Sequence, residues 1–290
     1  MRCRPLLAVL ALAAALVVAG CGSAESAGPD EGAVDAAATT SPADFGHVHG
    51  LSVSESDLII ATHTGLWRSP RGSTTATRVG TSRRDVMGFT GVGDRLFGSG
   101  HPDPADPGGE PANVGVITSS DAGRTWAPVA LTGEVDFHAF GGSRRALYGY
   151  DGASGRLLAS GDEGRSWQEL PEAPDDVFSI AVDPADSRAM LVATPGGVQR
   201  SGDGGRTFRP ARVPPGILAW ATGTAFAVGA DGAVQRSTDD GRTWEAAGSI
   251  RSLPVAAYAS ADALYVAQED GTVLVSTDQG ERFTTRARLE

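Results

Sequence analysis

A short motif that recurs along the chain limits the choice of fold more than any other sequence feature. Five segments fit the pattern Ser-x-Asp-x-Gly with an aromatic residue three positions later, and they begin at Ser119, Ser160, Ser201, Ser237 and Ser276. Successive segments begin 41, 41, 36 and 39 residues apart, and a degenerate sixth copy begins at Ser69. A period of about 40 residues is typical of repeat proteins in which each unit forms a small β-sheet.

The chemistry of the motif indicates a tight turn between two strands. Each copy lies between short runs with β-strand character, such as residues 197–200 before the third copy. The Asp side chain can accept hydrogen bonds from backbone N–H groups of a turn, and Gly readily adopts a positive φ. The closing aromatic residue, such as Trp126, can pack between neighbouring sheets. We therefore interpret the motif as a structural hairpin that carries no information about catalysis.

Segments of this form resemble the Asp-box (BNR) repeats of sialidase-like, sortilin-like and photosystem-assembly-factor-like β-propellers. Six copies across residues 44–290 allow about 41 residues for each unit, which is the size of a four-stranded blade. The fold that we expect is therefore all-β, namely a six-bladed β-propeller with Asp-box hairpins.

The inner strand of each expected blade can be aligned from the sequence. The six aligned segments begin at His47, Asp85, Asp136, Asp176, Gly216 and Pro254. Their fifth residue is always large and apolar, which predicts a ring of core side chains formed by Leu51, Phe89, Phe140, Ile180, Trp220 and Tyr258.

The first 20 residues predict a secretory signal rather than part of the fold. A basic start precedes an apolar run over residues 6–18, which is short for a membrane span. The following Val-Ala-Gly-Cys21 resembles the lipobox of bacterial lipoproteins, and this resemblance implies cleavage before Cys21 and lipidation of its thiol. The sequence thus predicts a lipoprotein signal at 1–20, a flexible tether at 21–43 and the propeller at 44–290. We expect an exported protein, lipid-anchored to the outer face of the cytoplasmic membrane.

Charge and cysteine content exclude several partners. The formal net charge is −11, and removing a signal with two arginines and no acidic residue leaves −13. Such a chain repels phosphate, so we expect no nucleic-acid partner. Cys3 would leave with the signal and Cys21 would be acylated, so the mature chain would offer no thiol for a disulfide or a metal. The acidity favours cations instead.

All five histidines are expected on one face of the propeller, opposite the Asp-box turns. His47, His49 and His138 open inner strands, whereas His63 and His101 end second strands. Neutral imidazole binds zinc and copper, and a thioether favours copper(I). We therefore predict a copper or zinc site at the channel mouth, with the ligands His47, His49, His63, His101, His138 and Met87.

Three carboxylates that open inner strands would orient these imidazoles from behind, namely Asp85, Asp136 and Asp176. For any one histidine alone, the alternative is a hydrogen bond to a backbone carbonyl. Five histidines on one face of three consecutive blades favour a shared site. For Met87, the roles of ligand and core residue stay equally open.

The segment from His101 to Val114 is far longer than its counterparts in the other blades. Asp103, Asp106 and Glu110 would add carboxylates to the site if this segment covered it. A lid and a solvated insertion are both compatible with the sequence.

The histidine motifs, such as the one spanning residues 47–51, resemble a group of exported bacterial Asp-box proteins that are often labelled sialidase-like or glycosyl hydrolase-like. This resemblance implies a propeller but no established activity. The Phe-Arg-Ile-Pro-type motif of sialidases is missing, which argues against their catalytic site. We therefore favour a non-enzymatic protein that binds a metal ion or small ligand. Two alternatives stay open: a glycosyl hydrolase acting on extracellular glycans, and a scaffold for a protein partner in a membrane or envelope complex.

Overall fold

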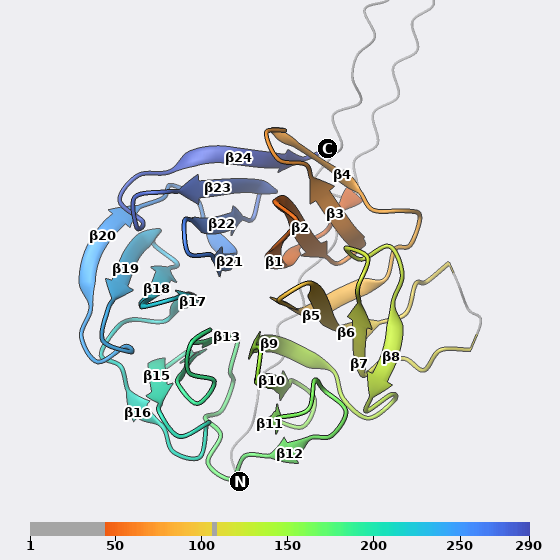
Figure 1. Cartoon of the computed structure of the whole chain (residues 1–290), viewed down its shortest axis with the longest axis horizontal. Coiled ribbons are helices and arrows are strands. Elements are labelled where there is room, and N and C mark those ends of the chain that lie inside the picture. Colours follow the sequence, from red (N-terminus) through yellow and green to blue (C-terminus); the bar gives the residue numbers. More distant parts are fainter. Residues whose placement is uncertain (1–43, 106–108) are drawn as a thin grey trace, which may run out of the picture. The chain divides into compact units, whose positions relative to one another are not determined.

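The computed structural model describes residues 44–105 and 109–290. The predicted signal and tether, with Cys21, lie outside the described residues, and so does Asp106. The described residues form β-strands and no α-helix, which agrees with the expected all-β class (Figure 1). Within these ranges there is no helix of the length and apolarity that a membrane crossing requires.

Four of the sheets have four strands each, and consecutive strands pair in antiparallel order. The first of these comprises β5 (Asp85–Val92), β6 (Arg95–His101), β7 (Val116–Ser119) and β8 (Ala127–Ala130). The second comprises β9 (Phe137–Ser143), β10 (Ala146–Asp151), β11 (Arg156–Ser160) and β12 (Gln168–Glu169). The third comprises β13 (Ser179–Val182), β14 (Met190–Thr194), β15 (Gly197–Ser201) and β16 (Arg209–Pro210). The fourth comprises β17 (Gly216–Ala221), β18 (Thr224–Gly229), β19 (Ala233–Ser237) and β20 (Glu245–Ser249).

A further sheet of eight strands joins the first and last parts of the described chain. Its first half is β1 (Val48–Ser54), β2 (Asp57–Thr62), β3 (Gly65–Ser69) and β4 (Thr75–Arg78). Its second half is β21 (Pro254–Ala259), β22 (Leu264–Gln268), β23 (Thr272–Ser276) and β24 (Thr284–Leu289). The halves meet where β24 pairs in parallel with β4.

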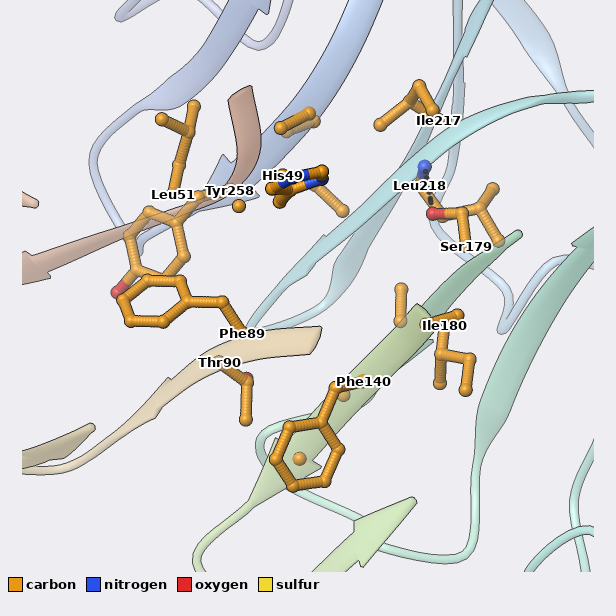
Figure 2. Close-up of a pocket in the computed structure, with 18 of the residues that line it drawn as sticks. His49, Leu51, Phe89, Thr90, Phe140, Ser179, Ile180, Ile217, Leu218 and Tyr258 are labelled. Carbon is orange, nitrogen blue, oxygen red and sulfur yellow. Dashed lines mark hydrogen bonds between the residues drawn. The ribbon is translucent and has the colours of Figure 1, made fainter. Parts of the chain in front are cut away.

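The innermost strands of the sheets are β1, β5, β9, β13, β17 and β21. Each contacts the next in this order, and β21 contacts β1, which closes a ring (Figure 1). On the ring axis lies a cavity of about 130 Å³, lined by residues from all of these strands. The predicted apolar column lines this cavity, as Figure 2 shows for Leu51, Phe89, Phe140, Ile180 and Tyr258. Tyr258 is half-buried and the other members of the column, including Trp220, are buried, so the core prediction is confirmed for those.

Strand composition follows from position in the ring. The second strands β2 and β14 are buried on both faces, and each contains an unbroken apolar run, at 58–61 and 190–193. A sheet covered on both faces needs such a run rather than an alternation of polar and apolar residues. The outermost strand β12 is only Gln168–Glu169 and both residues are exposed. Burial therefore decreases from these second strands to the outermost strand.

The five Ser-x-Asp-x-Gly segments, called the repeat turns below, connect the third and fourth strands of their sheets. In the turn from Ser160, the Ser160 hydroxyl donates to Asp162 Oδ1 at 2.8 Å and accepts from the Gly164 N–H at 2.9 Å. Asp162 also accepts from the N–H and hydroxyl of Ser166, at 2.9 and 2.6 Å. The fourth residue of each turn has a positive φ, such as 61° at Glu163. The turns therefore satisfy their own polar groups, as the sequence predicted.

The degenerate copy at Ser69 has no Asp and is held differently. Arg286 of β24 donates to the Ser69 hydroxyl at 2.9 Å, to the Ser73 carbonyl at 2.7 Å, and to the Ser69 and Pro70 carbonyls at 3.2 Å. These bonds support the β4–β24 junction from a side chain far away in the sequence.

Candidate metal centre

The residues that open the inner strands lie at the opposite end of the sheets from the repeat turns. Four of these inner strands carry a β-bulge there. The extra residue is Val255 in β21, and in the other three strands it is His49 in β1, Met87 in β5 and His138 in β9. The bulge at His49 falls between the pairs Val48–Thr62 and Gly50–Ala61. The bulge at Met87 falls between Val86–Gly100 and Gly88–Ser99, and the bulge at His138 falls between Phe137–Asp151 and Ala139–Tyr150. A bulge redirects its side chain relative to the regular alternation. These side chains line the axial cavity, and Figure 2 shows His49 among the side chains around it.

Three imidazoles gather beside the first bulge. The ring centroids of His47 and His49 are 5.9 Å apart, those of His47 and His63 are 5.9 Å apart, and those of His49 and His63 are 6.1 Å apart. His63 directly follows β2, and its N–H donates to the His47 carbonyl at 3.0 Å, which holds the two residues side by side.

Asp85, the first residue of β5, brings a carboxylate to these rings. Its Oδ1 lies 3.3 Å from His49 Nε2, and its Oδ2 lies 2.7 Å from His63 Nδ1. One coordinating atom from each of His49, His63 and Asp85 lies within 4.8 Å of the others, a grouping that can hold a metal ion. His47 is not part of this close group, although its ring flanks it. We call His49, His63 and Asp85 the first cluster.

The first cluster contains buried polar atoms that lack hydrogen bonds. His49 Nε2 and both oxygens of Asp85 make no hydrogen bond within the described part of the chain, although the carboxylate lies within ion-pairing distance of both imidazoles. The Asp85 side chain is only 8% exposed. A buried carboxylate without donors is energetically costly unless a cation neutralises it. In a tetrahedral zinc site with bonds of roughly 2.0–2.1 Å, ligand atoms lie about 3.4 Å apart, which is close to the 3.3 Å between His49 Nε2 and Asp85 Oδ1.

A second group lies at the next junction between sheets. His138 Nε2 donates a hydrogen bond to Asp136 Oδ2 at 2.9 Å, and His101 Nε2 lies 3.6 Å from the same oxygen. Asp136 directly precedes β9, His138 is its bulged residue, and His101 ends β6. We call His101, Asp136 and His138 the second cluster. The structure thus divides four of the predicted histidine ligands between two groups, and places His47 beside the first.

In the second cluster, Asp136 and His138 change each other's pKa. Burial disfavours the charged form of Asp136, but the hydrogen bond from His138 and the charges of nearby imidazoles outweigh burial and lower the pKa of Asp136. The same hydrogen bond raises the pKa of His138. Each group therefore stabilises the charged form of the other.

The remaining predicted residues have different surroundings. Asp176 is exposed and precedes β13, and its N–H donates to the Tyr150 hydroxyl at 2.9 Å. Among the described residues, its carboxylate contacts neither cluster. Met87 is half-buried and lines the axial cavity. Asp85, expected to orient a ring from behind, instead lies among the candidate ligand atoms.

The acidic residues of the long loop hold the loop in place. Asp103 accepts from the N–H of Arg83 at 2.7 Å and from that of Ala105 at 2.9 Å, and these bonds lower the pKa of Asp103. Glu110 accepts from Arg84 Nη2 at 2.6 Å. Asp103 and Glu110 thus tie the loop to the segment before β5 and do not join the clusters.

Comparison with known proteins identifies the fold and not the activity. No protein-family model matches the chain, and no curated protein matches it. Among solved structures, the chain is similar to one in a nidogen/laminin complex, with a TM-score of 0.60 and 12% identity, covering 79% of this chain and 92% of that one.

Two further solved structures are longer proteins. The GH74 enzyme of Niastella koreensis matches with a TM-score of 0.55 and 16% identity over 83% of this chain and 45% of the enzyme. PorZ, a surface component of the type-IX secretion system of Porphyromonas gingivalis, matches with a TM-score of 0.53 and 15% identity over 82% of this chain and 32% of PorZ. The chain spans less than half of either protein. At these identities the likeness supports a β-propeller-like fold alone.

Proposed function

We propose that this protein is a six-bladed β-propeller of the Asp-box type that binds a zinc or copper ion through His49, His63 and Asp85. In this interpretation the eight-stranded sheet comprises the first and last blades, joined by the β4–β24 pair. One observation carries the metal proposal: His49 Nε2 and both Asp85 oxygens converge, buried, without hydrogen bonds among the described residues.

The donor set selects the class of metal. Two imidazole nitrogens and a carboxylate oxygen suit zinc and copper(II), whereas calcium and magnesium prefer oxygen ligands throughout. His63 is 55% exposed, so the ion would be open to solvent on one side. His47 flanks that side and would supply a further imidazole after a rotation of its ring.

The cellular setting is also a proposal, because the relevant residues lie outside those described. The lipobox-like sequence ending at Cys21 supports export and lipid anchoring on the outer face of the cytoplasmic membrane. A tether over residues 21–43 would place the propeller near the membrane surface, and the protein would bind its metal ion there.

A hydrolase would use these carboxylates differently. Glycoside hydrolysis needs two carboxyl groups on either side of the scissile bond, free to act as acid, base or nucleophile. Asp85 and Asp136 each face imidazoles instead. This arrangement favours cation binding over hydrolysis. The scaffold alternative stays a prediction, and no contact described above favours it.

Metal uptake tests the proposal. The full chain, purified without a polyhistidine tag, is expected to bind Zn²⁺ or Cu²⁺ in titration calorimetry, and His49→Ala or Asp85→Asn is expected to weaken binding about 100-fold. Asp176→Asn is the matched control, because it removes an acidic group from the same face without touching a cluster. Absence of uptake, or variants that bind as well as the unmodified protein, would overturn the proposed function.

A further inference from the structure

The two junctions between the first three inner strands have the same plan. A histidine at the end of a second strand faces an aspartate at the start of the next inner strand: His63 faces Asp85, and His101 faces Asp136. A bulged histidine then completes each set, His49 from the strand before the junction and His138 from the strand after it. The chain has no histidine after His138, so no later junction repeats the plan.

The hydrogen bonding of His101 fixes where its lone pair points. His101 Nδ1 lies 2.9 Å from the Ala112 carbonyl oxygen. A carbonyl can only accept, so Nδ1 carries the hydrogen, and a neutral ring then has its lone pair on Nε2. A metal-binding histidine is commonly oriented in this way by a carbonyl behind it.

This lone pair faces another acceptor. His101 Nε2 is 3.6 Å from Asp136 Oδ2, and a carboxylate oxygen also can only accept. The second oxygen, Asp136 Oδ1, is buried and has no hydrogen-bond partner in the part of the chain that the structure describes. When the His101 ring is neutral, two acceptors thus face each other beside a buried unpaired oxygen, and a cation between them stabilises this arrangement.

The geometry points to a second metal site at this junction, held by His101, Asp136 and His138, so that the protein binds two ions rather than one. Unlike the first cluster, these three residues do not bring all of their ligand atoms within 4.8 Å of one another. Binding therefore requires the partly exposed rings of His101 and His138 to turn toward Asp136. In the absence of metal, His138 Nε2 donates its hydrogen to Asp136. An incoming ion takes the place of that hydrogen, and the proton leaves to solvent or moves to the other nitrogen of the ring. The metal class rests on the proposed function, because the donor set is again two imidazoles and one carboxylate.

Stoichiometry tests this inference. The full untagged chain is loaded with Zn²⁺, separated from free metal, and its zinc content is measured by mass spectrometry. We expect two ions in the unmodified protein, one in Asp136→Asn, one in Asp85→Asn, and none in the double variant. Asp176→Asn is expected to retain two. His101→Ala is a second variant of the same site; the His101 side chain is half-buried and outside the apolar core, so its removal leaves the core intact. Thermal unfolding checks that each variant is folded.

The outcomes separate the two proposals. One ion that is lost in Asp85→Asn and retained in Asp136→Asn would overturn the second site and leave the proposed function standing. One ion that is lost in either variant would mean a single shared centre and would also overturn the second site. No bound ion in the unmodified protein would overturn both proposals.

Discussion

Aspartates lie at both ends of the sheets, but their carboxylates differ in hydrogen bonding. At the end with the repeat turns, each aspartate accepts several hydrogen bonds from its own turn, as Asp203 does from Thr207 and Ser201. At the other end, Asp85 is buried and its oxygens make no hydrogen bond among the described residues. A satisfied carboxylate stabilises the fold, whereas an unsatisfied one is tolerated where something else is bound. The comparison therefore separates aspartates that stabilise turns from those that we propose as metal ligands.

The pKa values express this contrast at the turn end. Hydrogen bonds from Thr125 and Ser119 lower the pKa of Asp121 to about 2, although burial opposes the change. Asp162, Asp203 and Asp239 behave in the same way. In the last turn Arg282 stands where the other turns have Thr or Ser, so Asp278 lacks the second of the two hydroxyl donors. Hydrogen bonds from the Arg282 N–H and the Ser276 hydroxyl still lower the pKa of Asp278.

The largest expected effect is at the histidine end. Asp85→Asn is expected to weaken zinc affinity about 100-fold. In metal-free protein the same substitution is expected to leave Tm unchanged or raise it, because it removes a buried charge that lacks donors. Calorimetric titration and thermal unfolding measure the two quantities. A clear fall in the Tm of the metal-free variant would show that Asp85 is structural and would remove the contrast.

The same substitution at the turn end is expected to do the reverse. Asp203→Asn loses charge-assisted hydrogen bonds to Thr207 and Ser201, which lowers stability by about 1–3 kcal/mol and Tm by roughly 3–10 °C. Zinc stoichiometry should stay as in the unmodified protein. A drop in metal content without a loss of stability would contradict the division between the two ends.

Acid should affect the turns over a defined range. Their aspartates have a folded pKa of about 2, below the ordinary value of 3.8, so the stability they contribute is complete above pH of about 4. It is lost as the pH falls through about 2. Thermal unfolding of metal-free protein between pH 5 and pH 2 should show this loss, and Asp203→Asn should reduce its steepness. An equal pH dependence in the two proteins would mean that the turn is not the source.

The smallest expected effect concerns the fourth position of a turn. Ala122 has a φ of 58°, where a side chain is strained, and the third turn already has Gly204 at this position. Ala122→Gly is expected to raise stability by up to about 0.5 kcal/mol, since relief of strain exceeds the added chain entropy. The neighbouring Ser120→Gly, at a residue without a positive φ, should lower stability slightly. Denaturant unfolding compares the pair, and a gain from both variants would exclude the strain explanation.

The sequence predicts most of the turn end because the contacts there are local. Each hydrogen bond of the turn from Ser160 joins residues at most four positions apart, so the sequence spacing of the residues determines which groups meet. The face that carries the histidines is predictable for a similar reason, because strand order determines which end of each strand meets which. The apolar column around the axis follows from the same alignment.

The arrangement of the candidate site is less predictable because it depends on partners in other sheets. The bulges at His49 and His138 arise from pairing with a neighbouring strand, and the aligned sequence segments give no sign of them. Asp85 and Asp176 occupy equivalent sequence positions, yet only Asp85 has a histidine at the end of the preceding second strand to face. That pairing of residues across a junction is the signal that would have separated the two clusters.

The parallel pairing of β24 with β4 has a consequence for how the protein reaches its final form. Arg286 and Ser69, which hydrogen-bond across this seam, are 217 positions apart in the chain. Contacts over so long a span carry a high entropic cost and form slowly. We expect the β4–β24 pairing to form last during refolding and to break first when the protein is heated or pulled. The sheets earlier in the chain would then still hold their histidines together.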